Sequence, residues 1–142
     1  MEIKELFNKP SIIGICSDSN QGKSNLLYHI IQTLKSNFEF NLFTYGLKKP
    51  FGIEINSIEE LEQITHSVII LDEFFNLFDL QDTKKRRGIE KTIRLIYHNN
   101  NILVLSGLPD NYKKFISQNL DKVIFLKSSL SAFINGSRIK NI

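Results

Sequence analysis

The residues best suited to chemistry form one short segment near the start of the sequence. Ser17–Ser24 separates a short apolar run from an amphipathic one and ends in Gly22, Lys23 and Ser24. A loop that joins a strand to a helix can point backbone N–H groups and the positive end of the helix at an anion. Gly22 permits close approach of a phosphate, Lys23 supplies a charge for the β and γ phosphates, and the Ser24 hydroxyl can ligate Mg²⁺. A Gly-Lys-Ser turn also recurs by chance, but the strand–loop–helix setting favours a phosphate loop. The residues that we expect to contact the phosphates are Ser17, Asp18, Ser19, Asn20, Gln21, Gly22, Lys23, Ser24 and Asn25.

An acidic pair follows a second apolar run. Val68–Leu71 is continuous and β-branched, and Asp72 and Glu73 come directly after it. Because the carboxyl ends of parallel strands face the ligand crevice, we expect both carboxylates beside the phosphate loop. Asp72 is suited to hold Mg²⁺, and Glu73 is suited to accept a proton from an attacking water. Strands also end at charged residues simply to reach solvent, and the phosphate loop makes that alternative less favourable here.

A third polar position closes the next apolar run. Ile102–Leu105 is followed by Ser106 and Gly107. A hydroxyl at this strand end can sense the γ phosphate or position the water, so Ser106 joins Lys23 and Glu73 as a candidate catalytic residue. The alternative is a serine that begins a turn.

The elements that must position these residues alternate along the chain. Short apolar runs predict five strands, at 11–16, 38–45, 68–71, 102–105 and 123–126. Helical spacing predicts helices at 24–34, 88–98 and 111–120, and the capping-box spacing of Ser57 and Glu60 predicts a short helix through Ile64. Asn135-Gly136 predicts a hairpin in the tail. Continuous apolar strands that alternate with helices imply a mostly parallel sheet covered on both faces, an α/β fold of three layers.

Composition limits the class of protein. The 142 residues are 42% hydrophobic and 23% charged, as in an average globular chain, and the length predicts one domain over residues 1–142. We expect the core at about 11–127 and the hairpin tail at about 128–142. The net charge of +3 permits a nucleic-acid partner without predicting one. The single cysteine, Cys16, excludes an internal disulfide. Since there is no basic leader and no apolar run near the ~20 residues of a membrane span, we expect a cytoplasmic protein without membrane contact.

The phosphate loop and the acidic pair together resemble those of P-loop NTPases with a catalytic glutamate. That resemblance implies an ATPase with ATP and Mg²⁺ as cofactors, Ser24 and Asp72 as metal ligands, and a five-stranded sheet in the order 5-1-4-3-2. The segments after Glu73 are similar to the FtsK–HerA group, especially viral DNA-packaging ATPases. The similar segments are Ile93–His98, Ile102–Ser106 and Ile116–Asp121. This narrower resemblance implies a DNA-packaging or DNA-translocating motor subunit, double-stranded DNA as a partner and a ring of identical subunits.

The sequence departs from these families at three positions. Ser17 occupies the first glycine position of the phosphate loop, Tyr97 stands where the group commonly has arginine, and Ser106 or Gly107 replaces a sensor glutamine. Arg86, Arg87 or Arg94 could supply the missing arginine across a subunit interface.

Two other functions stay open. A non-catalytic nucleotide-binding or interaction module with the same fold would explain Ser17 and Tyr97. A small nucleotide kinase is the second alternative, although the chain has little room for a lid and Glu73 favours water as the acceptor. The basic run Lys84–Arg87 is expected in a loop, where it is either solvated or contacts DNA phosphates. The apolar cluster of Phe74, Phe75, Leu77 and Phe78 is expected to pack in the core, with base stacking and a subunit contact as the alternatives.

Overall fold

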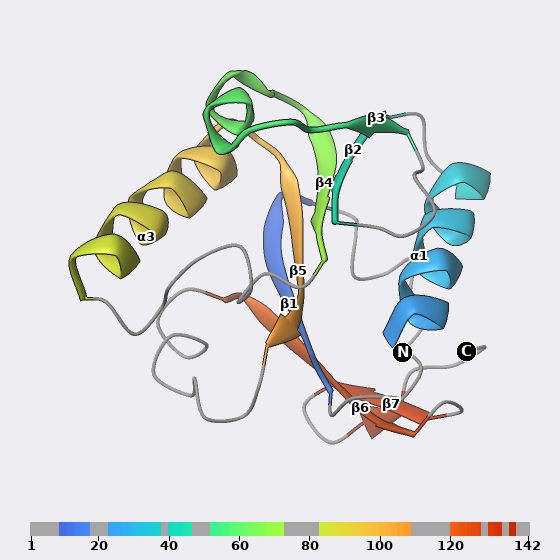
Figure 1. The fold of residues 1–142 in the computed structure, drawn as a ribbon. Helices are drawn as coiled ribbons and strands as arrows, with labels where there is room; N and C mark the ends of the chain where they lie inside the picture. The colour runs from blue at the N-terminus through green and yellow to red at the C-terminus, as the bar shows by residue number, and fades with distance from the viewer. Residues whose placement is uncertain are drawn as a thin grey trace.

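The apolar runs of the sequence form the strands of one mostly parallel sheet (Figure 1). The computed structural model describes residues 9–17, 23–37, 40–46, 52–72, 83–108, 120–128, 131–134 and 137–138. The strands are β1 (Ser11–Ser17), β2 (Asn41–Tyr45), β3 (Ile53–Glu54), β4 (Ser67–Leu71), β5 (Ile102–Leu108), β6 (Lys122–Ser128), β7 (Ser131–Ile134) and β8 (Ser137–Arg138). The helices are α1 (Lys23–Asn37), the 3-10 helix η2 (Ile58–Gln63) and α3 (Thr83–His98).

The sheet order confirms the predicted topology. The strands lie in the order β3-β2-β4-β5-β1-β6-β7-β8. The five predicted strands correspond to β1, β2, β4, β5 and β6, so their order across the sheet is 5-1-4-3-2, and all of their pairings are parallel. The two-residue β3 adds a parallel edge beside β2. The predicted hairpin is present as β7 and β8, which extend the sheet antiparallel to β6.

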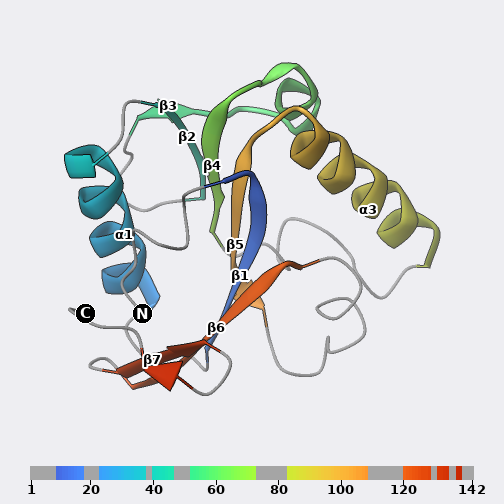
Figure 2. The ribbon, with the colours of Figure 1, turned by 180° about the vertical axis from the view of Figure 1, so that it is seen from behind.

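Two helices cover opposite faces of the sheet, as the front and back views show (Figures 1 and 2). On one face, Leu27, Ile30 and Ile31 of α1 pack into a buried cluster with Ile13 of β1 and Ile70 of β4. On the other face, Leu61 of η2 and Ile93 and Ile96 of α3 are buried against the strand side chains that point to that face. Central strands buried on both faces need continuous apolar runs, which is why the sequence shows them without alternation.

Several element boundaries differ from the predictions. The segment after Ser57 is a 3-10 helix and not an α-helix, and Ser57 makes no side-chain cap; the Glu60 carboxylate instead accepts from the Asn56 N–H at 3.1 Å. Strand β5 continues to Leu108, so Ser106 lies within a strand and does not begin a turn. Helix α3 begins at Thr83, which places the basic run Lys84–Arg87 in its first turns and not in a loop. Lysine and arginine are good helix formers, so that run extends the helix without apolar periodicity.

Some predicted features lie outside the described residues. They are the helix at 111–120, the apolar cluster at 74–78 and the hairpin turn at 135–136. Cys16 is buried in β1, as expected of a small packing residue. No helix in the described ranges is long and apolar enough to cross a membrane.

Candidate functional site

Three polar positions of the predicted site belong to the carboxyl ends of neighbouring strands. Asp72 follows the last residue of β4, and Ser106 lies in β5 one residue after Leu105, the partner of Leu71. Ser106 is in turn paired with Ile15 of β1, the strand that leads to Ser17. The parallel register therefore brings the acidic strand, the serine strand and the strand before the phosphate loop to one edge of the sheet, where ligands bind in open α/β folds.

A hydrogen bond joins Asp72 to Ser106. The Ser106 hydroxyl donates to Oδ1 of Asp72 at 2.6 Å, while the carbonyl oxygen of Leu71 lies farther away at 3.4 Å. Ser106 is fully buried and Asp72 is only 6% exposed. A distance of 2.6 Å is typical of a hydroxyl that donates to a carboxylate, which is a stronger bond than one between neutral groups. The two residues were each singled out in the sequence, but their contact across 34 positions was not predicted.

The backbone of Asp72 is held from the other side by β2. Its N–H donates to the Tyr45 carbonyl oxygen at 2.9 Å. Gly46, the residue after Tyr45, has a φ of +82°, and a Cβ built on it would lie 2.8 Å from the Asp72 carbonyl oxygen. Glycine is thus required at position 46 both by the backbone angle and by the approach of Asp72. In the sequence, Gly46 is only a glycine directly after the predicted strand at 38–45, which does not indicate the approach of Asp72.

A bulge in β5 follows the serine directly. Ile15 pairs with Ser106 and Cys16 pairs with Leu108, so Gly107 is an extra residue in β5, with φ of +81°. Bulges bend a strand and redirect its side chains, and they are frequent beside active sites. The glycine that follows the serine in the sequence was the available signal for this bulge.

The amino end of β4 is anchored by a buried amide that sequence reasoning missed. Oδ1 of Asn101 accepts from the Ser67 N–H at 2.9 Å, and its Nδ2 donates to the carbonyl oxygens of Ile64 at 2.8 Å and Ile96 at 3.0 Å. Asn101 is 0% exposed. The Asn101 side chain thus links β4 to the segment after η2 and to α3. The sequence signal that could have indicated this role is an asparagine directly before an apolar run.

The remaining predicted site residues are described only in part. Lys23 and Ser24 are the first residues of α1, and Asn25 is exposed in its first turn. Ser17 is the last residue of β1. The loop 18–22 and Glu73 lie outside the described residues. The structure therefore places both ends of the phosphate loop and the strand before Glu73, and it brings together Asp72 and Ser106.

The oxygen ligands at this edge suit Mg²⁺. The Asp72 carboxylate is a hard oxygen ligand, and Mg²⁺ is commonly held by one or two carboxylates together with water and substrate phosphates. Within the described ranges, no group of three or more His, Cys, Asp or Glu side chains is arranged to hold a metal ion. The Asp72 carboxylate therefore fits a metal that is shared with phosphates.

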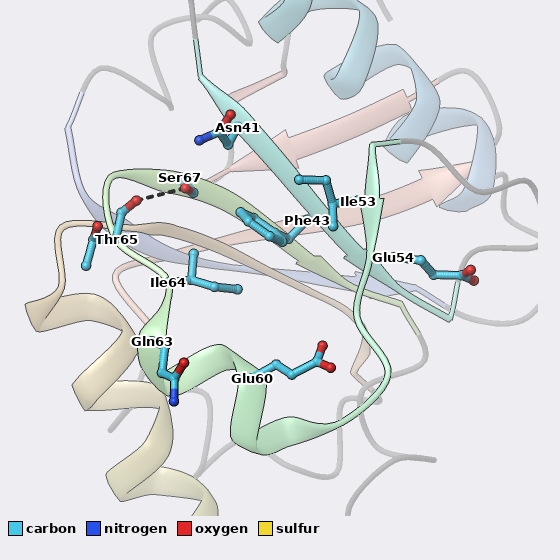
Figure 3. Close-up of a pocket in the computed structure, with 9 residues that line it drawn as sticks. All are labelled: Asn41, Phe43, Ile53, Glu54, Glu60, Gln63, Ile64, Thr65 and Ser67. Carbon is cyan, nitrogen blue, oxygen red and sulfur yellow. Dashed lines mark hydrogen bonds between the residues drawn. The ribbon is translucent and has the colours of Figure 1, made fainter.

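Two pockets formed by described residues lie at the other end of the strands. Figure 3 shows a pocket of about 370 Å³ between the start of β4, β2, β3 and η2. Phe43, Ile53 and Ile64 supply apolar walls, and Glu60 lies at its margin. A second pocket, of about 490 Å³, includes His66 and Asn100 beside the starts of β4 and β5. Since Ser67 lines both pockets and begins the strand that Asp72 follows, neither pocket is the predicted phosphate site.

Comparison with known proteins supports the fold. No protein-family model and no curated protein matches the chain. Among solved structures, the chain is similar to the flagellar accessory protein FlaH from Methanocaldococcus jannaschii, with a TM-score of 0.61 and 12% sequence identity. The match covers 91% of this chain and 79% of the FlaH chain. At this identity the similarity concerns the fold alone, a mostly parallel α/β fold.

Proposed function

We propose that this chain is a P-loop ATPase that binds ATP at the carboxyl edge of its sheet and hydrolyses it with water. The observation that carries the proposal is the bond between the Ser106 hydroxyl and the Asp72 carboxylate, both buried, beside the strand that leads into the phosphate loop. A carboxylate that served only to make the strand end soluble would be exposed to solvent. Asp72 is buried and held in one orientation, which favours a role in binding a metal and phosphates.

Each residue has a defined part in the proposed reaction. Lys23 and the backbone amides of the loop 17–25 bind the phosphates, and Ser24 and Asp72 hold Mg²⁺. When bound, Mg²⁺ neutralises charge on the β and γ phosphate oxygens. Glu73 orients a water and accepts its proton as the water oxygen attacks the γ phosphorus and the bond to the bridging oxygen breaks. The products are ADP and inorganic phosphate.

Ser106 acts in this proposal through Asp72. Its hydroxyl has one proton, which points to the Asp72 carboxylate at 2.6 Å. We therefore assign Ser106 as a positioning residue for the metal-binding carboxylate, and this assignment replaces direct contact with the γ phosphate as its main role.

The DNA-motor part of the proposal rests on the resemblance to the FtsK–HerA group. Two of the arginines that could act across a subunit interface, Arg87 and Arg94, are exposed on α3, as is Tyr97. Arg86 differs from them because its Nε lies 3.8 Å from Oε1 of Glu90 on the same helix. The measurement that tests this part is ATP hydrolysis with and without double-stranded DNA, together with the mass of the particle in solution. Stimulation by DNA and a ring-sized particle support a motor subunit, and hydrolysis by a monomer that ignores DNA contradicts it.

The ATPase proposal is tested by two variants with matched controls. Lys23→Ala is expected to abolish binding of Mg²⁺–ATP, whereas Lys35→Ala, at the other end of α1, leaves it unchanged. Glu73→Gln is expected to keep ATP binding and to abolish hydrolysis, whereas the exposed Glu62→Gln does neither. Unchanged turnover in Glu73→Gln removes Glu73 from the mechanism.

A non-catalytic module with the same fold is favoured by Ser17 and Tyr97, the departures from the family patterns. Calorimetry with Mg²⁺ separates the alternatives. Absence of any ATP affinity supports an interaction module, and binding without phosphate release supports a nucleotide-binding module. A product in which the γ phosphate has moved to a nucleoside supports a small kinase.

A further inference from the structure

One face of α3 carries a continuous row of positive side chains. Lys84, Arg87, Lys91 and Arg94 follow one another at spacings of three and four residues, and all four are exposed. We call this set the basic stripe. At 100° per residue these positions fall within about 80° of one another around the helix, and with 1.5 Å per residue they span about 15 Å of its length.

The basic stripe lies opposite the buried face of the helix. Ile93 and Ile96, at 2% and 1% exposure, face the sheet in one of the two apolar clusters. The midpoint of their helical positions is about 170° from the middle of the stripe. Figures 1 and 2 show α3 on the outside of one face of the sheet. The stripe therefore points away from the protein interior and is accessible along its whole length.

The charge of the chain is concentrated on this helix. α3 contains six lysines and arginines and one glutamate, a net charge of +5, whereas the whole chain carries +3. The rest of the chain is thus net negative, at −2. Arg86, which lies beside the stripe, is 3.8 Å from Glu90 on the same helix.

Two features of α3 work against its own stability. Its first turn has no acidic residue and several cations, although the amino end of a helix is already positive. Gly88, which weakens a helix, has nothing within 4 Å of a Cβ built on it, so packing does not require it. The first feature is explained if an anionic partner lies against this face, because negative charge near the amino end of a helix stabilises it.

We infer that the basic stripe binds the phosphate backbone of double-stranded DNA. A duplex carries a high density of negative charge along its axis, about one charge per 1.7 Å with both strands counted, so four cations over about 15 Å can each lie near a phosphate. A membrane surface is less suitable, because a helix at a lipid interface buries a continuous apolar face beside its basic face. Ile93 and Ile96 of α3 are in the core, and the exposed Leu95 and Tyr97 lie about 160° apart around the helix and form no such face. The inference rests on the proposed function only in choosing DNA as the polyanion.

The test is the salt dependence of DNA binding, measured without nucleotide. Fluorescence anisotropy of a labelled mixed-sequence duplex gives the dissociation constant at several salt concentrations. Four phosphate contacts predict a slope of about −3.6 in log K against log salt, which weakens binding about 150-fold between 50 and 200 mM. The double variant Arg87→Gln/Arg94→Gln is expected to halve the slope and reduce that change to about 12-fold.

A second double variant controls for net charge. Lys9→Gln/Lys35→Gln removes the same charge from exposed positions off the stripe and is expected to keep the full slope. Arg87→Lys/Arg94→Lys keeps both charges and is also expected to keep it, since phosphate contacts need charge and not a planar guanidinium. Circular dichroism confirms that each variant is folded.

The inference is overturned if the stripe variant keeps the wild-type slope, if both glutamine variants lose it equally, or if the lysine variant loses it. It is also overturned if the protein ignores DNA at low salt and sediments with anionic lipid vesicles instead. Because the assay contains no nucleotide, DNA binding through α3 by a chain without ATPase activity contradicts the proposed function alone. Hydrolysis of ATP by a chain whose DNA binding ignores the stripe contradicts this inference alone.

Discussion

Replacing Ser106 by alanine removes the hydroxyl that holds the Asp72 carboxylate. The bond is 2.6 Å long and lies between two buried groups, so it belongs to the charge-assisted class, whose net contribution is about 1.5–3 kcal/mol. If the bond orients Asp72 for Mg²⁺, the loss appears in the concentration of Mg²⁺ that half-saturates ATP binding or hydrolysis. Since about 1.4 kcal/mol is a factor of ten, we expect that concentration to rise about 10- to 100-fold in Ser106→Ala.

The assay is a Mg²⁺ titration of fluorescent ATP binding and of phosphate release, with folding checked by thermal melting. Ser67→Ala is the matched control, because Ser67 is also a buried serine but lies at the opposite end of β4 from Asp72. Its hydroxyl donates to the Thr65 carbonyl oxygen at 2.8 Å. It removes a buried hydroxyl without touching Asp72. A Ser106→Ala protein that is folded and shifts the Mg²⁺ midpoint no more than Ser67→Ala does would refute the positioning role.

Three further predictions concern the framework of the site. Asn101→Ala removes three buried hydrogen bonds and is expected to lower the free energy of unfolding, measured in urea, by about 3 kcal/mol. Asn99→Ala is the control: it removes an exposed hydrogen bond to the Glu62 carbonyl oxygen and is expected to cost less than about 1 kcal/mol. Equal losses in the two variants would contradict the anchoring role of Asn101. Replacing two glycines by alanine is expected to change the free energy of unfolding in opposite directions in the same assay. Gly46→Ala destabilises the protein by at least about 1–2 kcal/mol, because position 46 has a positive φ and its Cβ would contact Asp72. Gly88→Ala stabilises the protein by about 1 kcal/mol, because its Cβ contacts no other residue. Burial and then the nearby Lys9 charge lower the pKa of Lys122, with Asp121 opposing them, so the charged form is disfavoured in the fold. Stability relative to Lys122→Met should therefore rise with pH between the lowered pKa and the ordinary value of 10.5, and a pH-independent difference in melting temperature would count against it.

Much of the fold could be predicted because its signals are local. Four consecutive apolar residues at Val68–Leu71 are enough to indicate a strand buried on both faces. The order of the strands is not local; it followed from the resemblance to P-loop NTPases, and the register confirms it. The start of α3 was misplaced because the run Lys84–Arg87 lacks apolar residues, although its residue types favour a helix.

The candidate site was predictable by residue and not by contact. Asp72 could be assigned because a carboxylate after a buried strand has few alternatives in this fold. For Ser106 the sequence left both a turn and a sensor open, and β5 excludes the turn by continuing past it. The supports at Gly46 and Asn101 were missed, since each acts on a strand distant in sequence.

The sequence by itself determined which chemical groups are present and at which strand ends and helix starts they stand, because those positions depend on neighbouring residues. It indicated a phosphate loop before the first helix, carboxylates after a buried strand and a cluster of cations between them and the next strand. Only the tertiary structure decided that Ser106 donates to Asp72 and that four of the cations lie on the face of α3 opposite the buried one. Those facts depend on strand register and helical phase across the whole chain, where a shift of one residue turns a side chain to the other face of the sheet.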